Sequence, residues 1–157
     1  MRELILKMSM SVDGFVSDLE GANTWMYGSD PESKAWAVEA TWNASLHIMG
    51  ARSFLAMAAF WPTSTMEFAP PMNQIPKAVF SKQGAAILKD LGEVPPGAQA
   101  SAGSWREAYV ASGDLAAEIA RLKEGDGKPI LAHGGVVFAR SLVAHGLVDQ
   151  FMLGVHP

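Results

Sequence analysis

The segment Ile130–Val143 joins a short apolar run to a helical pattern through two adjacent glycines, Gly134 and Gly135. The apolar run has the length of a buried strand, and the apolar residues from Val136 onward recur at helical spacing. The first amides of a helix lack internal partners and carry the positive end of its dipole, so they bind phosphate where glycine leaves the backbone open. The turn therefore predicts a phosphate site. The alternative is a tight turn that needs glycine for steric reasons alone.

Apolar runs of strand length alternate with helical patterns along the chain. This alternation predicts a three-layer α/β/α fold with a mostly parallel central sheet, and no linker divides residues 1–157 into more than one domain. The segment between Trp61 and Pro76 is expected to be irregular because it holds four prolines. The expected strands are Glu3–Met10, Ser45–Met49, Lys77–Lys82, Gly97–Ala102, Ile130–Ala132 and Leu147–Val155. The expected helices start at Pro31 with Asp30 as the cap, after Gly50, near Gly84, at Leu115 and at Val136.

Small, hydroxyl and cationic residues follow three of these expected strands. Because ligands bind beyond the carboxyl ends of parallel strands, these residues should meet at one rim of the sheet. Two helix starts with glycine suit a pyrophosphate, and added cations suit a further phosphate, so we expect NADP(H) to bind here. The alternative is that the cations are solvated surface charges. The candidate residues are Gly50, Arg52, Ser53, Ser81, Lys82, Gly134 and Gly135.

Composition excludes several other kinds of site. The net charge of −4 and the scattered Lys and Arg residues argue against a nucleic-acid surface. The chain has no cysteine, and its four histidines show no metal-ligand spacing, so we expect no metal site. No apolar run has the length of a membrane span or a signal peptide, which leads us to expect a cytoplasmic protein without a membrane partner.

Two residues in the segment after the first strand are candidates for contact with a substrate. Asp13 is the best candidate for acid–base chemistry, although an Asp-Gly pair is also typical of a turn whose carboxylate binds its own backbone. Trp25 could stack on nicotinamide or on the substrate, and the alternative is an aromatic ring packed beneath its loop.

Four segments, in the same order, resemble the dihydrofolate-reductase-like superfamily, in the branch that includes the reductase domain of bifunctional riboflavin biosynthesis enzymes. Ser-Val-Asp-Gly-Phe is similar to its Ser-Leu-Asp-Gly-aromatic segment, and the others are similar to its Gly-x-Arg-Thr turn, its Pro-Lys-x-Val-x-Ser-Lys/Arg strand and its Gly-Gly helix. The segments are Ser11–Phe15, Ile48–Phe54, Pro76–Lys82 and Ile130–Asp149.

The resemblance implies a three-layer reductase fold, homodimers and NADPH as the cofactor. It implies cofactor contacts from the rim residues named above and from Val136, Val137 and Phe138. One departure concerns the substrate, because Ala132 and His133 stand where the riboflavin branch carries a Glu that meets the ribityl group. Members of the family also continue through further edge strands, so the sheet of this chain is expected to lack its last C-terminal strands.

Together these observations predict an NADPH-dependent reductase that transfers a hydride to a small heterocyclic or carbonyl substrate. Hydride transfer is the chemistry of the cofactor, so few catalytic groups are required of the protein. A non-catalytic nucleotide-binding or oligomerising protein that keeps the same fold is the alternative.

Overall fold

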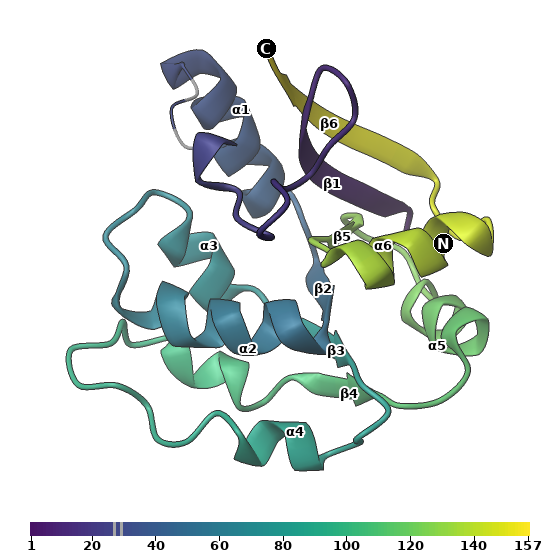
Figure 1. Ribbon diagram of the computed structural model, residues 1–157. Helices are drawn as coiled ribbons and strands as arrows, with labels where there is room; N and C mark the ends of the chain where they lie inside the picture. Colours follow the sequence, from purple (N-terminus) through teal and green to yellow (C-terminus); the bar gives the residue numbers. More distant parts are fainter. Residues whose placement is uncertain (27, 29) are drawn as a thin grey trace.

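The computed structural model describes residues 1–26, 28 and 30–157. Within these residues, six parallel strands form one sheet with the order β4-β3-β2-β5-β1-β6 (Figure 1). The expected α/β fold with a parallel sheet is therefore confirmed. The strands are β1 (Leu4–Ser11), β2 (Leu46–Gly50), β3 (Lys77–Phe80), β4 (Tyr109–Ala111), β5 (Ile130–Ala132) and β6 (Gln150–His156).

Helices join the strands, as parallel connections require. The α-helices are α1 (Pro31–Trp42), α2 (Ala51–Phe60), α3 (Ala69–Gln74), α4 (Ala86–Lys89), α5 (Leu115–Leu122) and α6 (Val136–Ala144). Short 3-10 turns cover η1 (Thr24–Met26), η2 (Trp61–Thr63) and η3 (Ala102–Trp105). No helix of the described residues is long and apolar enough to cross a membrane.

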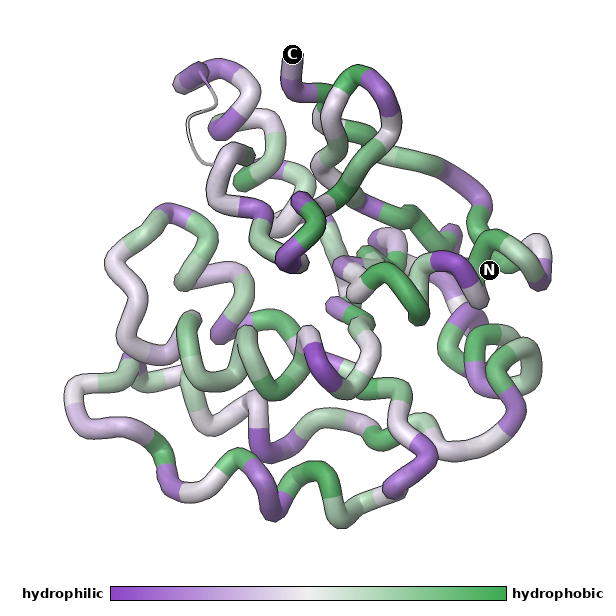
Figure 2. Tube along the Cα trace, in the orientation of Figure 1, coloured by the Kyte–Doolittle hydropathy of each residue, from purple (hydrophilic) through white to green (hydrophobic). Residues whose placement is uncertain are grey.

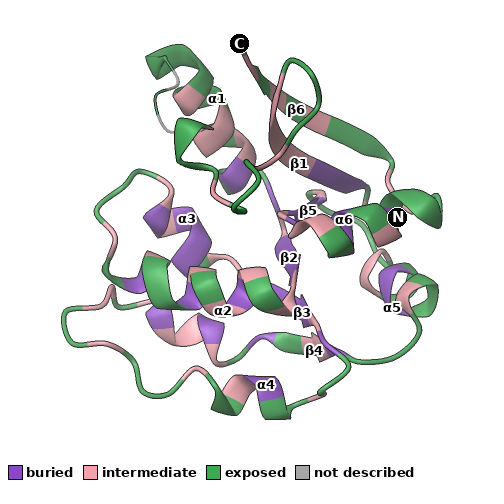
Figure 3. Ribbon diagram, viewed as in Figure 1, coloured by how far each residue is buried: buried purple, intermediate pink, exposed green. Residues whose placement is uncertain are grey.

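Both faces of the sheet are covered. Ile48 of β2 packs in one apolar cluster with residues of α5 and α6, whereas the adjacent Met49 packs in another with residues of α2, α3 and α4. Successive strand residues point to opposite faces, so the two clusters lie on opposite sides of the sheet. Figure 1 shows the corresponding helices on either side of the strands, which makes three layers. The buried positions are concentrated in the central strands (Figure 3).

Local sequence signals determine where several helices begin and end. The Asp30 carboxylate accepts hydrogen bonds from the amides of Glu32 and Ser33, both at 3.0 Å, so it caps α1 as expected. Helix α6 buries Phe138 and Leu142 and leaves Val137 exposed, and most of its residues are hydrophobic (Figure 2). Its apolar side faces the sheet.

Two expectations are wrong. Gly97–Ala102 is not a strand, because the chain turns there and continues into η3, and β4 begins only at Tyr109. In this turn the backbone N–H of Gln99 donates a hydrogen bond to the Pro62 carbonyl at 2.9 Å, so it is not free to pair in the sheet.

The proline-rich segment is also more regular than expected, because it contains η2 and α3. Its prolines stand in the first turns of these helices, where the missing N–H has no helical partner to lose. The far end of α3 is held by Lys77, whose ammonium donates to the carbonyls of Met72 and Ile75, both at 2.8 Å. This buried lysine replaces the solvent that the last carbonyls of the helix would otherwise bind.

Candidate active site

The two glycine turns predicted from the sequence lie in direct contact. The Gly50 amide, at the end of β2, donates a hydrogen bond of 2.8 Å to the carbonyl of Gly134, which follows β5. A Cβ atom added to Gly50 would lie 3.1 Å from the Cβ of Phe138, tighter than ordinary van der Waals contact. Glycine at this position therefore lets the first turn of α6 approach β2.

Each glycine of the pair after β5 has its own steric reason. Gly134 has a φ of +96°, a conformation that L side chains rarely adopt. Gly135 has an ordinary φ of −69° and caps α6, and the peptide bond between the two is cis. A Cβ on Gly135 would lie 3.1 Å from the Ser53 hydroxyl oxygen in the first turn of α2. The starts of α2 and α6 therefore face each other across a space that a side chain would fill.

The amides at these two helix starts are available to a ligand. Neither Gly50, which caps α2, nor Gly135, which caps α6, offers a side chain to them. The free N–H groups of both first turns, including those of Val136 and Val137, carry the positive ends of the two helix dipoles. Two such ends side by side favour a ligand with more than one negative charge.

The end of β3 approaches the same place through an aromatic contact. The rings of Phe80 and Phe138 lie 4.8 Å apart, between the last residue of β3 and the first turn of α6. The buried Ser81 follows Phe80, and its hydroxyl accepts a hydrogen bond from the Gln83 amide at 3.2 Å. Lys82 and Arg52 are exposed cations that make no hydrogen bond or ion pair within the described part of the chain. Both remain available to a phosphate.

A cavity of about 940 Å³ adjoins the glycine turns, on the side of the sheet that α1, α2 and α3 cover. His133, the residue before Gly134, lines it together with Lys7 and Ser9 of β1. Its walls are rich in methionine and aromatic side chains. These are Met8, Met26, Met57, Met66, Met72, Trp36, Trp61 and Phe68.

Lys7 brings an unpaired charge into this cavity. Its ammonium lies 5.9 Å from the centre of the Phe68 ring, and it makes no hydrogen bond or ion pair with any described residue. Burial lowers the pKa of Lys7. A partly desolvated ammonium without a partner is costly, and an anionic or carbonyl oxygen of a ligand would offset that cost.

Behind the cavity, His133 is hydrogen-bonded to a second histidine. Its Nε2 lies 2.8 Å from Nδ1 of His47, which is fully buried. Burial, followed by the charges of Lys77 and Lys7, lowers the pKa of His47 to about 3, and the Thr41 carbonyl opposes this change. Burial, His47 and Lys7 lower the pKa of His133 as well. Both rings are therefore neutral near pH 7.

Sequence reasoning identified neither Lys7 nor the histidine pair as parts of one site. The signal for Lys7 was a lone cation inside the apolar β1, next to Leu6, which packs in the core on the other face of the sheet. His47 and His133 are 86 residues apart, and only the pairing of β2 with β5 brings them together.

The structure places the two proposed substrate-contacting residues differently. Asp13 is exposed in the turn after β1, its carboxylate accepts a hydrogen bond from the Ser11 hydroxyl, and it is not among the residues that line the cavity. This geometry agrees with a turn residue, and its catalytic role stays a prediction. The Trp25 ring stands edge-on to His156, with centroids 6.0 Å apart, and His156 lines the cavity. A contact between Trp25 and the substrate also stays a prediction.

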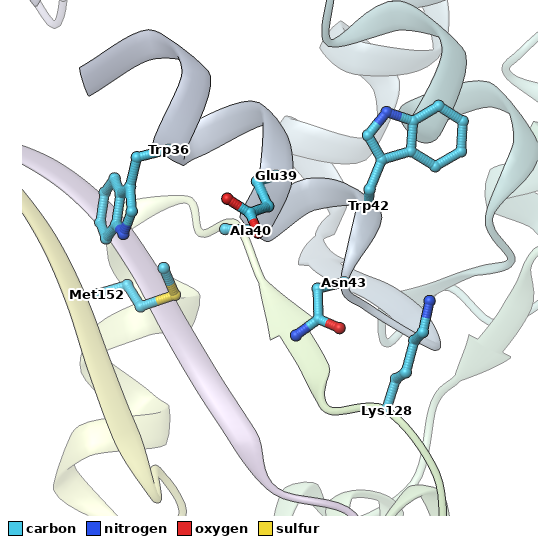
Figure 4. Close-up of a pocket in the computed structure, with 7 residues that line it drawn as sticks. All are labelled: Trp36, Glu39, Ala40, Trp42, Asn43, Lys128 and Met152. Carbon is cyan, nitrogen blue, oxygen red and sulfur yellow. The ribbon is translucent and has the colours of Figure 1, made fainter. Parts of the chain in front are cut away.

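A second cavity, of about 440 Å³, lies between α1, β6 and Lys128 (Figure 4). It contains none of the residues predicted for cofactor or substrate. The described residues also form no cluster of three His, Asp or Glu side chains that could hold a metal ion. The lining residues are Trp36, Glu39, Ala40, Trp42, Asn43, Lys128 and Met152.

The sequence of this chain is similar to those of known proteins. A family model described as the RibD C-terminal domain matches residues 2–157. The uncharacterized protein YyaP of Bacillus subtilis strain 168 is 24% identical over 156 residues, which are 99% of this chain and 75% of that protein.

Solved structures show the same fold at low sequence identity. A proposed riboflavin biosynthesis protein from Shewanella sp. PV-4 superposes with a TM-score of 0.64 and 21% identity over 96% of this chain and 75% of its own. A pyrimidine reductase-like protein from Corynebacterium diphtheriae superposes with a TM-score of 0.58 and 16% identity, over 97% of this chain and 73% of its own. The third structure is a diaminohydroxyphosphoribosylaminopyrimidine deaminase/5-amino-6-(5-phosphoribosylamino)uracil reductase from Thermotoga maritima. It superposes with a TM-score of 0.56 and 18% identity, over 92% of this chain and 42% of its own.

Proposed function

The chain belongs to the RibD C-terminal domain family, and from this premise we propose that it is an NADPH-dependent reductase of a small heterocyclic or carbonyl substrate. The observation that carries the proposal is the contact between the two glycine turns. It leaves two helix starts without a side-chain cap facing each other beside a cavity that holds an unpaired lysine.

The residues at the turns fit the phosphates of a dinucleotide. The space between Gly135 and Ser53 is one that a Cβ would fill, so the backbone can approach a pyrophosphate there. Gly50, Ser53, Gly134 and the amides of α6 would hold the pyrophosphate. Arg52, Ser81 and Lys82 would bind the 2′-phosphate that distinguishes NADPH from NADH. When bound, NADPH supplies the hydride.

The cavity suits a flat substrate with one polar edge. Its methionine and aromatic side chains adapt to planar ligands, while the Lys7 ammonium offers hydrogen bonds to a carbonyl or anionic oxygen. The names of the Thermotoga and Corynebacterium relatives support a pyrimidine as the heterocycle. The substitution of the riboflavin-branch Glu by Ala132 and His133 favours a substrate other than the ribityl compound.

One observation favours the non-catalytic alternative. Asp13, the carboxylate predicted to be catalytic, is bound to Ser11 in an exposed turn rather than lining the cavity. A nucleotide-binding protein without turnover would need only the glycine turns. Two measurements separate these functions, namely cofactor binding and cofactor oxidation.

The experiment is a screen for NADPH oxidation. The panel comprises 5-amino-6-(5-phosphoribosylamino)uracil, smaller pyrimidines and simple aromatic carbonyl compounds. A reductase oxidises NADPH with at least one member. Saturable NADPH binding without oxidation across the panel would favour the non-catalytic function.

A further inference from the structure

The hydrogen bond between His47 and His133 links the cavity to the interior of the sheet. His133 follows β5 and lines the cavity, whereas His47 in the neighbouring β2 has no exposed surface. Nε2 of His133 and Nδ1 of His47 lie 2.8 Å apart. The His133 amide also donates a hydrogen bond of 3.0 Å to the carbonyl of Ile48, so both its ring and its backbone are held against β2.

This hydrogen bond also couples the tautomers of the two rings. Both rings are neutral near pH 7, and a neutral imidazole has one donor and one acceptor nitrogen. If His47 carries its proton on Nε2, its Nδ1 accepts from Nε2 of His133, and Nδ1 of His133 is an acceptor. If His47 carries its proton on Nδ1, that proton is donated to His133, and Nδ1 of His133 is a donor.

The end of α1 selects the first of these two states. The backbone carbonyl of Thr41 belongs to the last turn of α1, and the Ser45 amide, four residues on, donates to Pro129 instead. This carbonyl acts on His47 as an acceptor and raises its pKa. Because Nδ1 of His47 is bonded to the other ring, the carbonyl faces the buried Nε2, which has no other partner. A carbonyl oxygen can only accept, so the proton of His47 belongs on Nε2.

In this state Nδ1 of His133 is an acceptor at the wall of the cavity. No described residue donates a hydrogen bond to this nitrogen, and it is not among their buried polar atoms without a partner. Lys7 stands beside it, because the residues before Lys7 and His133 are register partners in β1 and β5 and both side chains line the cavity. The cavity therefore presents a donor and an acceptor next to each other.

We propose that His133 is a specificity-determining residue whose Nδ1 accepts a hydrogen bond from an N–H group of the substrate, and that His47 is the positioning residue that fixes its tautomer. This inference rests on the proposed function and adds the polar group that the substrate must present beside the oxygen that Lys7 binds. An N–H next to a carbonyl is the edge of a cyclic amide, whereas a simple aldehyde or ketone offers no donor. The pair therefore favours a cyclic amide over a plain carbonyl compound.

Spectra of the ¹⁵N-labelled histidine rings test the tautomers without cofactor or turnover. In the unmodified protein we expect both His47 and His133 to carry the proton on Nε2. His47→Leu removes the acceptor from His133 Nε2, and a buried N–H without an acceptor is rarer than a buried acceptor without a donor, so the proton of His133 should move to Nδ1. His145→Leu is the control and should change neither ring, because His145 is exposed at the end of α6.

A proton on Nδ1 of His133 in the unmodified protein would overturn the inference. So would a proton that stays on Nε2 of His133 in His47→Leu, because His47 would then not fix the tautomer. If His47→Leu does not fold, the proton on His47 itself decides the positioning role, since only a proton on its Nε2 leaves Nδ1 to accept the bond.

Uracil and 1,3-dimethyluracil test the contact with a substrate, because they carry the same carbonyl groups and only uracil has ring N–H donors. With NADP⁺ present, uracil should bind roughly 3- to 10-fold more tightly, as expected for one neutral hydrogen bond, and should shift the Nδ1 signal of His133. The preference should vanish in His47→Leu, whereas a steric effect of the methyl groups would persist there.

Equal affinities in the unmodified protein, a preference that persists in His47→Leu, or an unchanged His133 signal at millimolar uracil would each contradict the specificity role. Failure of NADPH to bind would instead count against the proposed function. The tautomers are measured without cofactor, so their result is independent of that failure.

Discussion

Gly135 and Ser53 belong to the first turns of two different helices, and only the missing Cβ of Gly135 leaves space between them. The Cβ that any other residue would add lies 3.1 Å from the Ser53 hydroxyl oxygen. Together with the hydrogen bond between Gly50 and Gly134, this contact forms the phosphate site that we propose.

Gly135→Val should therefore lower the affinity for NADPH and NADH alike while the fold survives. The φ of −69° at Gly135 is open to other residues, but a branched side chain would occupy the space between the two helix starts. Calorimetry with both cofactors, together with circular dichroism, measures this. Gly134→Val is the matched comparison and should destabilise the fold, because Gly134 has a φ of +96°. If Gly135→Val folds and binds both cofactors with unchanged affinity, the glycine pair forms only a turn and does not contact the cofactor.

Lys82→Ala should weaken NADPH binding selectively. The exposed ammonium has no partner among the described residues, so its removal costs the charge-assisted contact with the 2′-phosphate, roughly 10- to 100-fold in affinity, and leaves NADH binding unchanged. Lys89→Ala on α4 is the control for loss of one surface charge. Equal losses for both cofactors would place Lys82 outside the 2′-phosphate site.

Lys7→Met should reduce kcat/KM roughly 10- to 100-fold, because a hydrogen bond from an ammonium to the polar edge of the substrate is lost. Its stability against urea should stay equal or rise, since an unpaired, partly buried charge is removed. Lys34→Met is the control, because Lys34 also lines the cavity but pairs with Glu67 at 3.7 Å. Normal kinetics in Lys7→Met would mean that the substrate does not meet this lysine.

Asp13→Asn tests whether the carboxylate is catalytic. If it is, NADPH affinity should stay near normal while turnover falls by roughly 10²- to 10⁴-fold, the range for general acid–base groups. Asn keeps the hydrogen bonds of the turn with Ser11, so folding should be unaffected. Turnover close to that of the unmodified protein would leave this loop a structural part.

Stability should fall as the pH drops from 6.5 towards 3. The pKa of His47 is about 3 in the folded protein and returns to its ordinary value of 6.5 on unfolding, so the unfolded state binds more protons between these values. The free energy of unfolding therefore rises with pH across this window, by on the order of a few kcal/mol. Urea titrations at several pH values should show a smaller change for His47→Leu. Equal slopes would mean that His47 titrates normally.

The fold could be predicted because its signals are local. The apolar run at Ile130–Ala132 and the Asp30 cap need only a few neighbouring residues, and both occur as expected. The strand predicted at Gly97–Ala102 failed because its backbone bonds to Pro62, and α3 was missed because Lys77, outside the helix, binds its last carbonyls. The first error comes from a contact between distant segments, and the second from a buried lysine that follows the helix by only three residues.

Some residues of the candidate site could be predicted from local sequence, and others could not. The glycines were identified because positive φ and close approach demand a particular residue, whereas the histidine pair depends on the register between β2 and β5. Homodimer formation, absence of nucleic-acid and metal partners and cytoplasmic location remain predictions from the sequence.

Calorimetric titration of the unmodified protein with NADPH and with NADH tests the central claim most directly. The two facing helix starts should bind the pyrophosphate of either cofactor. Contacts of the 2′-phosphate with Arg52, Ser81 and Lys82 should make the affinity for NADPH at least about tenfold higher than that for NADH, as one charge-assisted hydrogen bond allows. Equal affinities, or no binding of either cofactor, would contradict the account.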